Sequence, residues 1–135
     1  METSATITSS KHWFKFRFRD DIKPLIPHFA TVLATEDEHL MSNTISTLSN
    51  LLRHSNAYLK DLIANKIVQR ILDIIRNTKN QGILVFSLNF LQKAVQYPEF
   101  VNNFREEVLA VLRGTVVGPS DGEAAKKLKK IMEKL

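Results

Sequence analysis

The side chains best suited to acid–base or metal chemistry at neutral pH are histidines, and their spacing forms no known site. They are His12, His28, His39 and His54. No pair has the HExxH spacing of a zinc hydrolase, and the chain has no cysteine to act as nucleophile or metal ligand. The acidic turn 36–38 is suited to the start of the helix expected after it. We therefore predict no catalytic residue, no metal site and no cofactor, and a protein that is not an enzyme.

A second group of residues could bind a partner through aromatic rings and positive charge. In the segment KHWFKFRFR, residues 11–19, Phe14, Phe16 and Phe18 alternate with basic residues, and Trp13 precedes them. This alternation is typical of an extended strand. Such an arm could stack on single-stranded nucleic acid, contact a second copy of the chain, or cover an apolar end of the helical domain. We favour the covering strand, with Trp13 as a packing anchor.

The last predicted helix is rich in lysine. Its basic residues are Lys126, Lys127, Lys129, Lys130 and Lys134. They surround an apolar stripe that includes Leu128 and Ile131, which is the pattern of a terminal helix with a solvated outer face. The alternatives are a phosphate-contact surface and a calmodulin-type target helix.

These residues must be positioned by a domain whose class follows from composition. The chain has 135 residues, 44% of them hydrophobic, and a net charge of +5. That is enough for one domain with a core, and neither a signal peptide nor an apolar run of membrane-spanning length is present. We predict a flexible tail at 1–10, the aromatic and basic arm at 11–21 and a helical repeat domain at 22–135. With no cysteine, the expected location is intracellular, in the cytoplasm or the nucleus, with no membrane partner.

The helical segments repeat with a period of about 41–42 residues. Each unit has an apolar-periodic helix, a short polar turn and a second helix, and this period is typical of stacked helical repeats. The expected helices are 24–34, 39–54, 56–64, 67–76, 82–95, 98–103, 104–113 and 123–135.

The stretch SNTISTLSNLLRHSNAYLKDLIANKIVQRILDII, residues 42–75, resembles the armadillo-repeat family. The similarity covers roughly residues 22–135 and implies an all-α fold, a short right-handed solenoid of about three repeats. Asn65 stands where the family usually has glycine, so we expect Asn65 to adopt the left-handed conformation of that turn. The alternative fold is another small superhelix of about eight helices, such as a polymerase-tail-binding or cargo-sorting domain.

The resemblance also implies a groove lined by the third helix of each repeat. Asn50 matches the family's backbone-clamping asparagine, while Ser46 stands where tryptophan is usual. Aligning Leu88 with Leu48 places Phe86 and Phe90 at the same groove positions, where they are either core residues or an apolar patch. Asn50 is either a ligand clamp or an ordinary surface or inter-repeat amide. The predicted groove comprises Asn43, Ser46, Asn50, Arg53, Phe86, Asn89, Phe90 and Lys93.

The resulting hypothesis is a protein–protein interaction module that holds a segment of a protein or peptide partner in this groove. Two alternatives remain at this stage. One is nucleic-acid binding through the arm and the last helix. The other is a structural module that self-associates, for example as a homodimer, within a larger assembly.

Overall fold

The computed structural model describes residues 23–115 and 122–135, and this part of the chain is entirely helical apart from its turns. A 3-10 turn, η2 (Lys23–Leu25), leads into seven α-helices. They are α4 (Ile26–Ala34), α5 (Glu38–His54), α6 (Leu59–Ala64), α7 (Ile67–Asn77), α8 (Gln81–Ala94), α9 (Pro98–Gly114) and α10 (Gly122–Lys134). In these residues no helix is long and apolar enough to cross a membrane. The all-α prediction is confirmed for the described residues, and the predicted tail and arm lie outside them.

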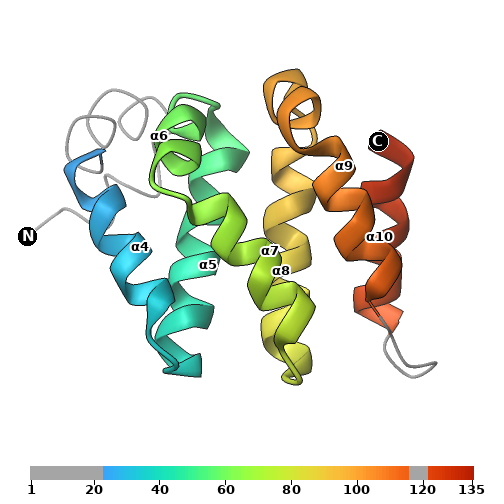
Figure 1. Cartoon of the computed structure of the whole chain (residues 1–135), viewed down its shortest axis with the longest axis horizontal. Coiled ribbons are helices and arrows are strands. Elements are labelled where there is room, and N and C mark those ends of the chain that lie inside the picture. The colour runs from blue at the N-terminus through green and yellow to red at the C-terminus, as the bar shows by residue number, and fades with distance from the viewer. Residues whose placement is uncertain (1–22, 116–121) are drawn as a thin grey trace, which may run out of the picture.

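The helices pack in two layers (Figure 1). One layer contains α4, α7 and α9 side by side, and the other contains α5, α8 and α10, with α8 packed between its two neighbours. The short helix α6 packs on α7. Thirty apolar residues from both layers form one continuous core. Within each layer, every helix contacts the next helix of the same layer. Helices α4 and α5 therefore lie at one end of the molecule, and α9 and α10 lie at the other (Figure 1).

Capping side chains explain where α5 and α8 begin. The Asp37 carboxylate accepts hydrogen bonds from the backbone N–H groups of His39 and Leu40, at 3.0 and 3.1 Å. Asn80 caps α8 in the same way through Ile83 N–H, at 3.1 Å. A side-chain oxygen at this position satisfies donors that the first turn of a helix leaves free. The acidic turn expected at residues 36–38 is therefore observed before α5, with Asp37 as the capping residue and Glu38 already in the first turn of the helix.

Neighbouring units are joined by hydrogen bonds between residues about one repeat apart in the sequence. Asn80 Nδ2 donates to Glu38 Oε1 at 3.1 Å across 42 residues, and Asn56 Nδ2 donates to Glu99 Oε1 at 3.1 Å across 43 residues. Gln96 Nε2 donates to Leu52 O at 3.3 Å, across 44 residues. The sequence period is thus also the spacing at which equivalent turns of adjacent units meet.

Two local predictions are wrong. The expected break between residues 103 and 104 is absent, because α9 runs unbroken from Pro98 to Gly114. Asn103 stays helical and its Nδ2 donates to Glu99 O at 2.8 Å. At the corresponding break between α6 and α7, the left-handed residue is Lys66, with φ 61°, and not Asn65. Asn65 instead caps the end of α6, since its Nδ2 donates to Asp61 O at 2.8 Å.

Candidate partner-binding site

The predicted groove residues belong to α5 and α8, and burial shows how these two helices correspond. The two helices bury the same positions when α8 is shifted by 43 residues. The matching buried pairs are Met41–Leu84, Thr44–Ser87, Ile45–Leu88, Leu48–Leu91, Leu51–Ala94 and Leu52–Val95. The capping residues Asp37 and Asn80 are also 43 positions apart. Leu88 is therefore equivalent to Ile45, and the alignment of Leu88 with Leu48 is wrong.

The shift of 43 residues changes which of the predicted groove residues are equivalent on α5 and α8. Asn43 pairs with Phe86, Ser46 with Asn89, and Asn50 with Lys93. Asn43, Asn50 and Phe86 are exposed, and Ser46, Asn89 and Lys93 are half-buried. Arg53 is exposed one turn beyond Asn50. Seven of the eight predicted residues therefore reach the surface of the α5–α8 layer, in rows that repeat from one helix to the next.

Phe90 is the exception, because its side chain is fully buried at 0% exposure. In the corrected register Phe90 is equivalent to Thr47, which is exposed on α5. The difference arises because α8 packs extensively against α5, whereas no described helix precedes α5 in the layer. Phe90 is thus a core residue and is removed from the predicted groove, whereas Phe86, one turn away, is 40% exposed.

Helix α10 completes one side of this surface. Lys127 Nζ lies 3.4 Å from Asn89 Oδ1 and 3.4 Å from Glu123 Oε2. Asn89 is therefore already engaged through its side-chain oxygen. Lys129 and Glu133 of α10 are both exposed.

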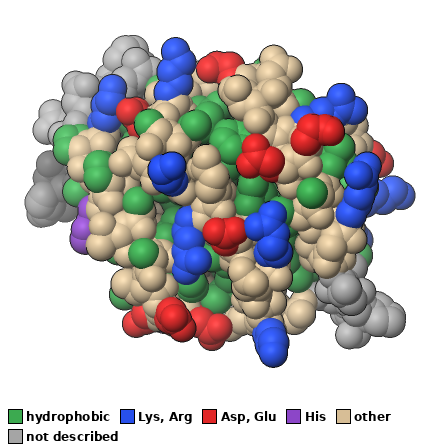
Figure 2. Space-filling view, viewed as in Figure 1, with side chains coloured by type: hydrophobic (Ala, Val, Ile, Leu, Met, Phe, Trp, Pro, Cys, Tyr) green, Lys and Arg blue, Asp and Glu red, His purple; other side chains and the backbone are tan. Residues whose placement is uncertain are grey.

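Charge distinguishes this layer from the other one. Helix α8 has no acidic residue, α5 has only Glu38 in its first turn, and α10 exposes Lys126, Lys129 and Lys130. Figure 2 views the layer of α4, α7 and α9, where acidic and basic side chains are interspersed. The α5–α8–α10 surface therefore offers amides, the exposed ring of Phe86 and an excess of positive charge.

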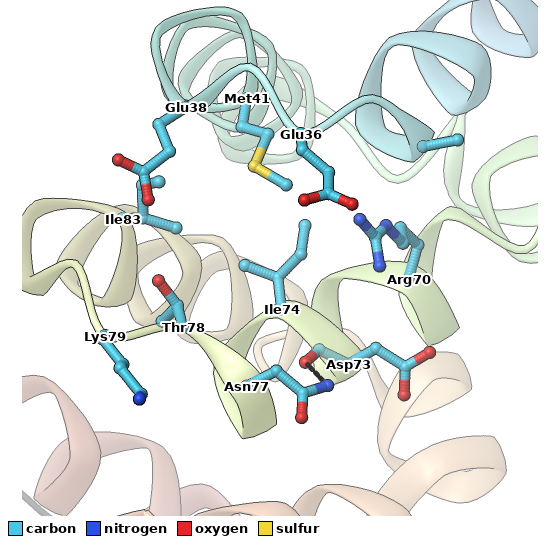
Figure 3. A pocket seen from close by; sticks show the side chains of 11 residues that line it. Glu36, Glu38, Met41, Arg70, Asp73, Ile74, Asn77, Thr78, Lys79 and Ile83 are labelled. Carbon is cyan, nitrogen blue, oxygen red and sulfur yellow. Dashed lines mark hydrogen bonds between the residues drawn. The ribbon is translucent and has the colours of Figure 1, made fainter.

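A separate cavity of about 710 Å³ lies where the α4–α5 turn meets α7 and the α7–α8 turn (Figure 3). The buried side chains of Met41, Ile74 and Ile83 line its apolar part. The carboxylates of Glu36 and Glu38 and residues of α7 line the rest, and Arg70 Nε donates to Leu33 O at 2.7 Å. Sequence patterns identified the acidic turn but not the cavity, because its two sides come from different repeat units.

The described residues bring together no set of metal-ligating side chains. No group of three or more His, Asp or Glu residues there could hold a metal ion. His28 and His39 are exposed on different helices. The aromatic arm residues Trp13, Phe14, Phe16 and Phe18, and also His12, lie outside the described part of the chain.

Comparisons with known proteins add no further assignment. No family model matches the chain, and searches of curated proteins and of solved structures find no match either.

Proposed function

We propose that the protein is a short right-handed α-solenoid of about three armadillo-like repeats that binds a segment of a protein partner. The proposed binding surface is the exposed side of α5 and α8, extended by α10. The observation that carries the proposal is the pairing of exposed or half-buried residues at a spacing of 43: Asn43 with Phe86, Ser46 with Asn89, and Asn50 with Lys93. A surface built from repeating rows suits a ligand that is itself extended and repetitive.

Each row offers a different interaction to such a segment. Asparagine amides both donate and accept hydrogen bonds, so they can pair with the backbone of an extended peptide. Phe86 offers an apolar contact on an otherwise polar surface, and aromatic side chains are frequent anchors of binding energy. Arg53, Lys93 and the exposed lysines of α10 favour an acidic partner. We infer that the ligand is an extended, acidic segment with at least one apolar side chain.

A peptide selection on the full-length chain tests this proposal. Random 12-residue peptides are selected on the immobilised protein, and affinities are measured by calorimetry on single variants. We expect the enriched peptides to be acidic. We expect Phe86→Ala and Asn50→Ala each to weaken them about 5- to 30-fold, which corresponds to about 1–2 kcal/mol.

The matched control is Asn102→Ala, since Asn102 is also an exposed helix asparagine but belongs to α9 in the other layer. Its substitution should leave the affinity unchanged. A set of enriched peptides that lose affinity in Asn102→Ala and not in Asn50→Ala would place the binding surface on the wrong layer and refute the proposal.

Nucleic-acid binding is the second candidate, and the exposure of Lys126, Lys129 and Lys130 on α10 favours it. The two candidates differ in salt dependence, because phosphate contacts release counterions and weaken steeply as salt rises. A single-stranded oligonucleotide is titrated at 50 and 200 mM salt with the wild type and with a variant carrying glutamine at these three positions. Binding that falls by more than about tenfold with salt and is lost in the variant would favour the nucleic-acid function.

A further inference from the structure

The first helix of the described chain leaves exposed a set of positions that the second unit buries. Helix α4 and the preceding turn repeat the apolar pattern of α7 with a shift of 42 residues, so Leu25 corresponds to Ile67. Leu25 is 45% exposed, whereas Ile67 is fully buried. Phe29 and Val32 are also only partly buried, although their equivalents Ile71 and Ile74 are in the core.

The same difference appears in the other layer. Leu40 on α5 corresponds to Ile83 on α8 in the register of 43. Leu40 is 44% exposed and Ile83 is 2% exposed. Thr47 and Phe90 show the same difference, since Thr47 is exposed and its equivalent Phe90 is buried. The side of α8 that faces α5 is covered, whereas the equivalent side of α5 is not. In both layers, therefore, the first unit exposes apolar positions whose equivalents in the second unit are buried.

These residues define one surface, which we call the N-terminal end face: Leu25, Phe29, Val32 and Leu40. In the second unit the equivalent residues are covered by the unit before it, through the α4–α7 and α5–α8 contacts. No described α-helix precedes α4, so this end of the stack has apolar side chains in the geometry that a further layer of residues would cover. The opposite end differs, because most of the exposed residues of α10 are charged.

We propose that residues 11–19 of the same chain cover the N-terminal end face and close the core of the first unit. The described chain begins at Lys23 on this end (Figure 1), so the preceding residues start beside the face. Nine residues can span at most about 30 Å, and α5, with 17 residues, is about 25 Å long. The segment is therefore long enough to cover the full height of the face.

The chemistry of the segment is complementary to this face. Its aromatic residues would supply apolar neighbours for the exposed leucines; these residues are Trp13, Phe14, Phe16 and Phe18. The start of the described chain at Lys23, beside Leu25, favours the segment of the same chain over a second copy. This inference does not depend on the proposed peptide-binding surface.

The single tryptophan, Trp13, reports on this packing in the full-length protein. We expect its fluorescence to be blue-shifted relative to the protein in urea, and to shift toward the urea value in Leu40→Lys. The control is Met132→Lys, because Met132 is a similarly exposed apolar residue, at 39%, on α10 at the opposite end. Wild-type emission already at the urea value, or equal shifts in both variants, would overturn the proposal.

Cross-linking adds a second readout and identifies the occupant. Because the chain has no cysteine, the pairs Phe16→Cys/Leu40→Cys and Phe16→Cys/Met132→Cys can be compared, with oxidised glutathione as the two-electron oxidant. We expect the first pair to form an intramolecular disulfide at least about tenfold faster, since a docked segment has a high effective concentration. Equal rates would show that the segment is not docked there. A mainly intermolecular product, with a doubled mass by light scattering, would identify a second copy as the occupant and overturn the proposal.

Discussion

At the scale of single residues, the units are joined by side chains that bind carbonyl groups near helix ends. Leu52 O, in the last turn of α5, accepts hydrogen bonds from Gln96 Nε2 and from the Tyr97 hydroxyl. Leu33 O, near the end of α4, accepts one from Arg70 Nε. The last carbonyls of a helix have no partner within the helix. These side chains therefore satisfy the helix ends and also tie one unit to the next.

Tyr97 leads to a prediction about pH. Burial raises the pKa of the Tyr97 phenol above its ordinary value of about 10, so the folded state holds the proton more tightly than the unfolded state does. The neutral phenol therefore stabilises the fold fully below about pH 10, and this contribution is lost as pH rises through the folded pKa. Urea unfolding followed by circular dichroism at pH 7 to 11.5 should show this loss in the wild type.

The control is Tyr97→Phe, which has no phenol to ionise. We expect it to cost about 1 kcal/mol at pH 7, because the hydrogen bond to Leu52 O is lost. Its free energy of unfolding should then fall less steeply than that of the wild type above pH 10. Parallel pH profiles for the two proteins would contradict the assignment of this titration to Tyr97.

At the scale of elements, one helix break in the second unit has no counterpart in the third. Helices α6 and α7 are separated because Lys66 adopts φ 61° and ψ 23°, whereas α9 continues unbroken for 17 residues. The stacked rings of Phe100 and Phe104, with centroids 5.3 Å apart, lie along one side of α9. The left-handed conformation costs about 1–2 kcal/mol for a residue with a Cβ, so the turn at Lys66 is held by the packing of α6 on α7.

Substitution of Lys66 tests this account of the turn. Lys66→Gly should raise the free energy of unfolding by about 0.5–1 kcal/mol, because glycine adopts this conformation without a steric penalty. The matched control is Lys60→Gly, an exposed lysine within α6, which should lower stability by about 1 kcal/mol. Both values come from urea unfolding at pH 7. Destabilisation of similar size in both variants would mean that the left-handed turn carries no strain.

At the scale of the whole molecule, the two layers share one core, and α8 is its central helix. It packs against α5 on one side and α10 on the other. Phe90 is fully buried in this core, and Phe86, four residues earlier, remains at the surface. Phe90 is therefore expected to contribute to the stability of the stack, whereas Phe86 is available to the surface proposed for binding.

A pair of alanine substitutions measures this separation. Phe90→Ala should lower the free energy of unfolding by about 3–5 kcal/mol, because it leaves a cavity between α5 and α8. Phe86→Ala should change it by less than about 1 kcal/mol, since the ring is largely solvated. Equilibrium urea unfolding with both variants decides the matter. Equal costs would mean that the two rings share one environment, and the register of 43 would then be wrong.

The sequence alone determined most of the helices and their order, because these depend on interactions within a few residues. Apolar spacing identified α5, α7 and α8 to within one residue at each end, and the period of about 41–42 residues matches the spacing of hydrogen bonds such as Asn80–Glu38. The acidic turn before α5 was also visible, because a helix N-terminus favours negative charge in the adjacent residues.

Only the tertiary structure decided which side of each helix contacts a neighbour. Phe90 and Phe86 both fit an amphipathic helix, and the packing of α8 against its neighbours buries one and leaves the other exposed. The left-handed residue was Lys66 rather than Asn65 because the packing of α6 on α7 sets the turn, and the cavity lined by Met41, Ile74 and Ile83 requires two units to be assembled. Periodicity shows that a helix has an apolar side, but contacts between distant segments determine what covers it.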